Sequence, residues 1–172
     1  SHVELEDPTR IVHEDRQRMA NVLDEAWPHR APIRIAHLGG GALTLARYVQ
    51  ATRPGSPQVV VEIERELPTL VTTALPMPRG TDLEVVIGDA REELAAMEGR
   101  RFDAIVLDVF SGEEPPAHLA AKDFYLEAIA HLEPDGLLLV NVGDDAGQRF
   151  LTAQVRELEE AAAEAGLSGV WT

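Results

Sequence analysis

Apolar and polar positions alternate in blocks along the chain, and the spacing within each block predicts its structure. Short runs of apolar and β-branched residues are typical of strands buried on both faces of a parallel sheet. They cover Ile33–Leu38, Gln58–Ile63, Leu83–Ile87, Phe102–Leu107 and Gly136–Val142. Segments with helical spacing lie between or after them: Ala42–Thr52, Leu67–Leu75, Arg91–Met97, His118–Leu132 and Phe150–Ala165. The alternation predicts an α/β fold with a doubly wound, mostly parallel sheet and helices on both faces.

The two ends of the chain depart from this alternation. Segment His13–Trp27 has helical spacing, and two prolines separate it from the first strand. We therefore expect residues 1–30 to be a helical segment that packs on the sheet or over the site, and residues 31–172 to form the α/β domain. The last residues, Gly169–Thr172, resemble the start of a strand. We expect the sheet to lack its last edge strands here and the natural protein to continue.

Composition and charge narrow the class of protein. A chain of 172 residues that is 45% hydrophobic suits one domain with a single core. It has no cysteine and its histidines lack metal-ligand spacing, so we predict no disulfide and no metal site. The net charge of −15 disfavours nucleic acid and would attract a cationic substrate, although acidic residues also keep proteins soluble. Without a membrane-spanning run or a signal-like N-terminus, the expected location is the cytoplasm.

A glycine turn directly follows the first predicted strand. Gly39, Gly40 and Gly41 let the backbone approach a ligand closely, and the next helix offers free N–H groups. Ligands of open α/β sheets bind beyond the carboxyl ends of the strands. Such a turn can also be a tight connection with no ligand, so it needs support from other residues.

Acidic residues at two further strand ends supply that support. Glu62 lies roughly 20 residues beyond the turn, where a carboxylate can accept hydrogen bonds from ribose hydroxyls, and Glu64 could compete for this role. Asp89, followed by Ala90, ends the third strand. Its carboxylate can accept a hydrogen bond from the exocyclic amine of adenine, or it can cap the next helix, and the two roles are compatible.

Asp108 ends the fourth predicted strand. In a doubly wound sheet this strand end lies beside the glycine turn, so Asp108 should face the reacting part of a ligand. A carboxylate there can bind an ammonium group or take a proton from an amine. The alternative is a strand-end aspartate that only caps its loop. The loop at 110–116 is rich in glycine and proline and is expected to form one wall of the pocket.

The ordered set of segments resembles the spermidine synthases (polyamine aminopropyltransferases), which have the fold of class I S-adenosylmethionine-dependent methyltransferases. The resemblance runs from Asp7 to Val142. It is carried by His37-Leu38-Gly39-Gly40-Gly41, Val61-Glu62-Ile63-Glu64, Gly88-Asp89-Ala90, Phe102-Asp103-Ala104-Ile105-Val106-Leu107-Asp108, Lys122-Asp123-Phe124-Tyr125 and Leu132-Glu133-Pro134-Asp135-Gly136.

This resemblance implies a role for each candidate residue. The three glycines would contact the nucleoside of decarboxylated S-adenosylmethionine or methylthioadenosine. Glu62 would hold the ribose and Asp89 the adenine, and Asp108 would deprotonate the attacking amine. The resemblance further implies a homodimer and a small-molecule amine as the substrate. The net charge and the lack of a long apolar run predict no nucleic-acid and no membrane partner.

The chain also departs from the family pattern. The segment Val12-His13-Glu14 matches a stretch that closes over the site, which makes His13, Glu14 and Ser111 candidate substrate-pocket residues. Ala42 and Ser111, however, stand where the family has aspartates, and Val12 stands where it has a tyrosine. Each change removes a group that would hold a cationic amine, and the loss of a charged hydrogen bond weakens binding. The nucleoside half of the site is intact and the amine half is degraded.

Three functions follow from these patterns. The first is a spermidine-synthase-like transferase that moves an aminopropyl group from decarboxylated S-adenosylmethionine to an amine. The second is a methyltransferase that uses S-adenosylmethionine itself and another acceptor. The third is a non-catalytic homologue that only binds the nucleoside.

Overall fold

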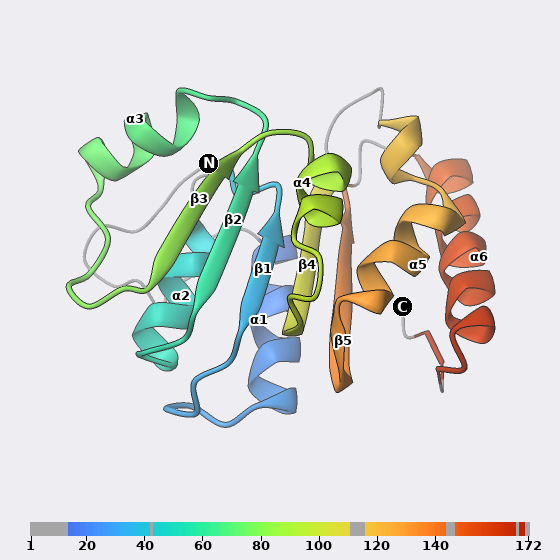
Figure 1. Cartoon of the computed structure of the whole chain (residues 1–172), viewed down its shortest axis with the longest axis horizontal. Helices are drawn as coiled ribbons and strands as arrows, with labels where there is room; N and C mark the ends of the chain where they lie inside the picture. Colours follow the sequence, from blue (N-terminus) through green and yellow to red (C-terminus); the bar gives the residue numbers. More distant parts are fainter. Residues whose placement is uncertain (1–13, 42, 111–115, 144–146, 168, 171–172) are drawn as a thin grey trace.

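The computed structural model describes residues 14–41, 43–110, 116–143, 147–167 and 169–170. Its centre is a five-stranded parallel sheet with the strand order β3-β2-β1-β4-β5 (Figure 1). The strands are β1 (Ile35–Leu38), β2 (Gln58–Glu62), β3 (Leu83–Ile87), β4 (Phe102–Phe110) and β5 (Leu132–Val142). This order confirms the predicted doubly wound α/β fold.

Helices cover both faces of the sheet. They are α1 (Glu14–Ala26), α2 (Thr44–Thr52), α3 (Leu67–Ala74), α4 (Ala90–Ala96), α5 (Lys122–Ala130) and α6 (Gln148–Glu164), with a short 3₁₀ helix, η1, at Ala117–Leu119. In Figure 1, α1 and α2 lie behind the sheet, and α4 and α5 lie in front of it. The central strands are therefore buried on both sides, which explains why they consist of continuous apolar runs.

Side chains of the central strands point alternately to the two faces. In β1, Ile35 packs with apolar residues of α1 and α2, whereas Leu38 packs with those of α4 and α5. In β4, Val106 packs on the first face and Leu107 on the second. Because strand side chains repeat every second residue, Asp108 shares the α1 face with Val106.

The strand order reverses between β1 and β4. From β1 the chain adds β2 and β3 on one side, and then returns to add β4 and β5 on the other. Leu38 at the end of β1 pairs with Val61 of β2 and Leu107 of β4, so three strands end close together. This switch point is where open α/β sheets form a ligand crevice.

A buried arginine fixes α1 against α2. Arg53 has no exposed surface, and its guanidinium donates to the carbonyls of Leu23 (3.1 Å) and Trp27 (2.6 Å) and to Oδ1 of Asp24 (2.9 Å). These bonds tie the C-terminal end of α1 to the end of α2. The N-terminal turn of α1 is thereby held at the opposite end, beside the carboxyl ends of the strands.

The helix predicted for His118–Leu132 is shorter in the structure. Residues 117–119 form the separate 3₁₀ turn, and α5 begins only at Lys122. The reason is tertiary: the backbone N–H of Lys122 donates to Oε2 of Glu157 in α6 (2.9 Å), and this bond fixes the start of the helix. Leu132 belongs to β5 instead of α5.

The last two strands are longer than the apolar runs predicted. β4 extends to Phe110, and β5 begins at Leu132, ahead of Gly136, where the strand was predicted to begin. The register between them shifts from Phe102 to Ala104 and again from Leu107 to Phe110. These irregularities let the strands continue through residues that a regular ladder would exclude.

Candidate functional site

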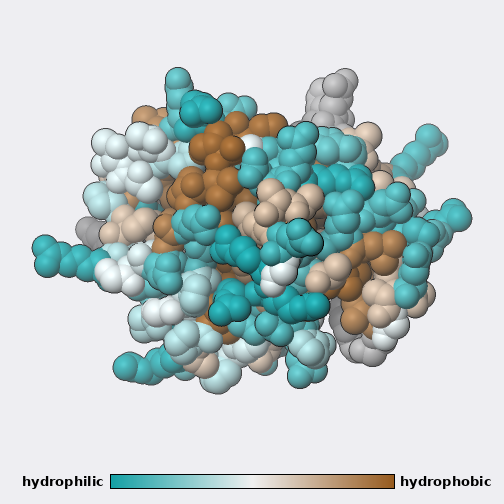
Figure 2. All heavy atoms as spheres, viewed as in Figure 1, coloured by the Kyte–Doolittle hydropathy of each residue, from teal (hydrophilic) through white to brown (hydrophobic). Residues whose placement is uncertain are grey.

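A cavity of about 800 Å³ opens at the carboxyl ends of the strands. Its lining comes from α1, the glycine turn, the ends of β2 to β5, and η1. The lining residues are Asp15, Arg16, Gly39, Gly41, Val61, Glu62, Ile63, Glu64, Leu67, Gly88, Asp89, Ala90, Asp108, Val109, Pro116, His118, Leu119, Asn141 and Gly143. Figure 2 shows apolar surface gathered over the upper ends of β2 and β3, within a mostly hydrophilic face. The cavity thus combines apolar walls with several charged and polar side chains, and small-molecule sites use such polar groups to orient a ligand.

The glycine turn passes too close to its neighbours for a side chain at Gly39 or Gly40. A Cβ on Gly39 would lie 2.5 Å from the backbone oxygen of Asp108, and one on Gly40 would lie 2.2 Å from Cγ1 of Val60. Gly39 also has a φ of +85°, which favours glycine. The turn is therefore packed directly between β2 and β4, and this brings Gly41 to the cavity.

Glu62 binds the glycine turn to the end of β2. Its Oε2 accepts hydrogen bonds from the backbone N–H groups of Gly40 and Gly41, each at 3.1 Å. Its Oε1 accepts one from the N–H of Glu64 at 3.0 Å. Only 7% of Glu62 is exposed, yet it lines the cavity. A carboxylate has about four acceptor positions, so one remains for a ligand hydroxyl.

Asp89 joins α4 to η1. Its Oδ1 accepts from the N–H groups of Arg91 and Glu92, which confirms that it is the N-cap of α4. Its Oδ2 lies 2.6 Å from Nε2 of His118. Burial raises the pKa of the Asp89 carboxyl, but the hydrogen bonds from His118 and the two backbone N–H groups outweigh it and lower the pKa overall.

Asp108 is held from two sides. Nδ2 of Asn141, in the neighbouring strand β5, donates to its Oδ1 at 2.8 Å. Nη2 of Arg16, from α1, lies 3.5 Å from its Oδ2. The Asp108 side chain is 14% exposed, so it can still meet a molecule in the cavity.

The structure brings most of the predicted site residues to this one cavity. Gly39, Gly41, Glu62, Asp89, Ala90 and Asp108 line it, and Gly40 contributes its N–H to Glu62. Glu14 is not among the lining residues and instead pairs with Arg18 at 2.7 Å. His13, Ala42 and Ser111 lie outside the described residues. The ligand roles of all these residues stay predictions.

Four further polar residues of the cavity were not predicted from the sequence: Asp15, Arg16, His118 and Asn141. Asn141 interrupts the apolar run of β5 near its carboxyl end, which is the same signal that identified Asp108. His118 lacks metal-ligand spacing, and such spacing gives no indication of whether a histidine pairs with a carboxylate. Arg16 gives no local signal, because its position depends on how α1 packs.

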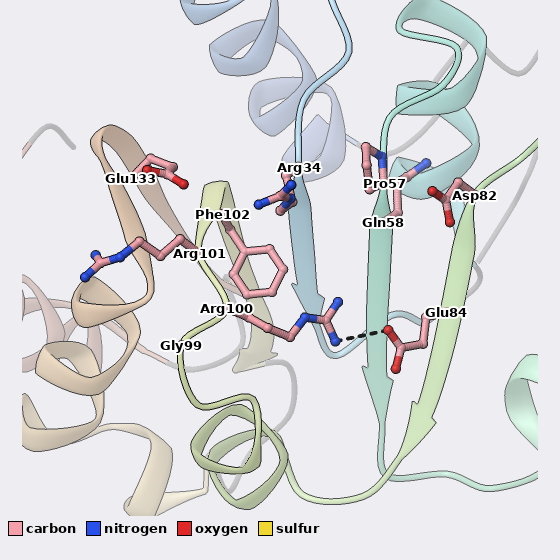
Figure 3. Close-up of a pocket in the computed structure, with 10 residues that line it drawn as sticks. All are labelled: Arg34, Pro57, Gln58, Asp82, Glu84, Gly99, Arg100, Arg101, Phe102 and Glu133. Atoms are coloured by element: carbon pink, nitrogen blue, oxygen red, sulfur yellow. Dashed lines mark hydrogen bonds and ion pairs between the residues drawn. The ribbon is translucent and has the colours of Figure 1, made fainter.

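A second hollow, of about 430 Å³, lies at the opposite, amino-terminal edge of the sheet (Figure 3). Two of its charged side chains pair with each other: Arg100 lies 3.0 Å from Glu84, and its guanidinium sits 5.6 Å from the ring centre of Phe102. Ligands of doubly wound sheets bind at the other edge. We therefore assign the candidate site to the larger cavity.

In the described part of the chain, no helix is both long and apolar enough to cross a bilayer. No cluster of three or more histidine, aspartate or glutamate side chains is placed to hold a metal ion there either.

Comparison with curated proteins shows similarity to polyamine aminopropyltransferases. The chain is 31% identical over 148 residues to the polyamine aminopropyltransferase of Vibrio vulnificus, covering 85% of this chain and 46% of that protein. It is 27% identical over 154 residues to that of Chromobacterium violaceum, covering 88% and 58%. The chain thus spans about half the length of the curated relatives it matches.

Solved structures give the same result. A probable spermidine synthase from Corynebacterium glutamicum superposes with a TM-score of 0.80 at 30% identity, covering 95% of this chain and 58% of that one. The spermidine synthase of Thermotoga maritima superposes with a TM-score of 0.65 at 21% identity, covering 85% and 50%, which supports the fold. No family model matches the chain. The comparisons confirm the predicted resemblance to the spermidine synthases and their methyltransferase-like fold.

Proposed function

We propose that this chain is a spermidine-synthase-like transferase that binds an S-adenosyl sulfonium nucleoside in the cavity at the carboxyl ends of the strands. The single observation that carries the proposal is the convergence of the glycine turn, Glu62, Asp89 and Asp108 on that cavity. Its volume of about 800 Å³ lies within the range of small-molecule sites. The proposal is supported by relatives that are named polyamine aminopropyltransferases, which are transferases.

Residues at successive strand ends would bind different parts of the nucleoside. Asp89, which follows β3, would accept the adenine amine, and Glu62, at the end of β2, would accept a ribose hydroxyl. Apolar side chains of Ile63, Leu67 and Leu119 also line the cavity and suit the faces of a base. Apolar walls together with fixed hydrogen-bond acceptors are what a nucleoside requires.

Asp108 would act on the nucleophile. When bound, the donor supplies a carbon made electrophilic by the sulfonium, with a neutral thioether as the leaving group. Asp108 would accept the proton that an attacking amine loses as its nitrogen forms the new bond to carbon. Asn141 fixes one oxygen of this carboxylate and leaves Oδ2 turned toward Arg16 and the cavity. Positioning of this kind is the main contribution that such a reaction requires of the protein.

Two versions of the donor fit this proposal. Transfer of an aminopropyl group from the decarboxylated donor to an amine is the version supported by the names of the relatives. Methyl transfer from S-adenosylmethionine is the second candidate, and the position of Arg16 favours it.

A cytoplasmic location and a homodimer stay predictions.

Calorimetric titration with methylthioadenosine tests the proposal. We expect saturable binding by the wild type and unchanged binding by Asp108→Asn, together with loss of product formation from either donor in that variant. Absence of nucleoside binding by the wild type would overturn the proposal. Full turnover by Asp108→Asn would show that Asp108 is not the group that accepts the proton of the attacking amine.

A further inference from the structure

One side chain in the cavity carries a permanent positive charge. The lining contains five carboxylates, but Arg16 is its only lysine or arginine among the described residues. Nη2 of Arg16 lies 3.5 Å from Oδ2 of Asp108, and it would lie 3.3 Å from a Cβ placed on Gly41. The guanidinium therefore sits between the glycine turn and Asp108.

The Arg16 guanidinium has further N–H donors beyond the nitrogen that faces Asp108. Within the described residues, Asp108 is the only partner that its side chain has, and the contact joins one nitrogen to one oxygen. A guanidinium carries five N–H donors in a planar fork that matches a carboxylate with two parallel hydrogen bonds. The Arg16 side chain is 22% exposed, so a ligand in the cavity can reach the remaining donors.

The order of the strands indicates which part of a ligand would lie there. Across the sheet the strand ends carry Asp89 at β3, Glu62 at β2, the glycine turn at β1 and Asp108 at β4. If adenine lies at β3 and ribose at β2, the chain attached to the sulfur continues over β1 and β4. Arg16 stands over that part of the row.

We propose that Arg16 is a specificity-determining residue that binds the carboxylate of the donor's amino-acid tail. The donor would then be S-adenosylmethionine with its carboxylate, and not the decarboxylated form. This inference rests on the proposed nucleoside site. The tail of the decarboxylated donor ends in an ammonium group alone, which the guanidinium repels. The tail of the intact donor offers a carboxylate to Arg16.

Calorimetry with three ligands tests the inference on the wild type. Methylthioadenosine has the nucleoside without a charged tail, decarboxylated S-adenosylmethionine adds the ammonium, and S-adenosylmethionine adds both charges. We expect the wild type to bind S-adenosylmethionine at least about tenfold more tightly than the decarboxylated donor. The opposite preference would overturn the assignment of Arg16.

Arg16→Gln tests the residue itself. The variant should lose about tenfold or more of its affinity for S-adenosylmethionine and keep its affinity for methylthioadenosine, which also shows that it is folded. Arg156→Gln is the matched control, because Arg156 pairs with Glu160 on the exposed side of α6, away from the cavity. It should bind all three ligands as the wild type does.

The outcomes separate the two proposals. If the wild type binds none of the three ligands, the proposed function fails and this inference fails with it. If the wild type binds methylthioadenosine but Arg16→Gln changes affinity for both donors equally, the nucleoside site stands and only the role of Arg16 is refuted. If Arg16→Gln does not fold, the ratio of the wild-type affinities for the two donors is the test of the role of Arg16.

Discussion

Asn141 donates a hydrogen bond of 2.8 Å from its Nδ2 to Oδ1 of Asp108, across the two neighbouring strands β5 and β4. Parallel pairing places both side chains at the carboxyl edge, so the amide can orient the carboxylate without blocking it. The second oxygen, Oδ2, remains turned toward the cavity and Arg16. Asp108 is thus a positioned group and not a freely rotating surface carboxylate.

Removing this orientation should lower turnover and spare nucleoside binding. We expect Asn141→Ala to reduce the release of thioether product by about tenfold to a hundredfold, because a misplaced reacting group loses much of the benefit of proximity. Affinity for methylthioadenosine should not change. Asn21→Ala, in the exposed Gln17–Asn21 pair on α1, is the control. Turnover at the wild-type level in Asn141→Ala would contradict the positioning role.

Glu62 should affect both the glycine turn and the nucleoside. Glu62→Ala removes the acceptor of three backbone N–H groups, so we expect a loss of about 1–3 kcal/mol in the free energy of unfolding. Affinity for methylthioadenosine should fall while the fold is retained. Chemical denaturation and calorimetry measure the two effects. Glu66→Ala, at an exposed carboxylate that makes no cap bond, should change neither quantity. Unaltered nucleoside affinity in Glu62→Ala would refute its ligand role.

The two roles of Asp89 can be separated by two substitutions. Asp89→Ala should cost about 1 kcal/mol of stability through the lost N-cap, and it should weaken nucleoside binding. Asp89→Ser keeps an N-cap oxygen but loses the carboxylate that lies beside His118, so only the binding should suffer. Thermal unfolding and calorimetry provide the comparison. Equal nucleoside affinity in Asp89→Ser and the wild type would limit Asp89 to capping.

A buried histidine should make stability depend on pH. Nε2 of His37 lies 2.8 Å from Oε1 of Gln58, whose Nε2 donates to the carbonyl of Ala46. Burial lowers the pKa of His37 from 6.5 to about 4. The unfolded chain therefore binds a proton between these two values while the folded chain does not, so stability falls as the pH drops from 6.5 toward 4.

The size of this effect follows from the shift. A lowering from 6.5 to about 4 corresponds to about 3 kcal/mol lost over that interval. His37→Asn, which does not titrate, should flatten the dependence between pH 6.5 and 4 by this amount. Denaturation curves at several pH values check it, with His131→Asn, at a partly exposed histidine, as the control. Identical pH profiles for His37→Asn and the wild type would show that His37 contributes nothing to the dependence.

The sequence predicted the sheet and one half of the site because both are local patterns. A continuous apolar run ending in an acidic residue indicates a buried strand whose end lines the cavity, as at Glu62 and Asp108. Arg16 and the start of α5 gave no such pattern. The position of Arg16 depends on Arg53, which anchors α1 from 37 positions further along, and α5 begins where Glu157 binds it. Contacts between segments that lie far apart in the sequence produce no repeating pattern of apolar residues in either segment.

A crystal structure of the chain soaked with methylthioadenosine tests the central claim most directly. The account predicts electron density beside Gly40, with the ribose hydroxyls at the Glu62 carboxylate and the adenine amine at Asp89. Density elsewhere, or a cavity that stays empty at saturating ligand, would contradict it.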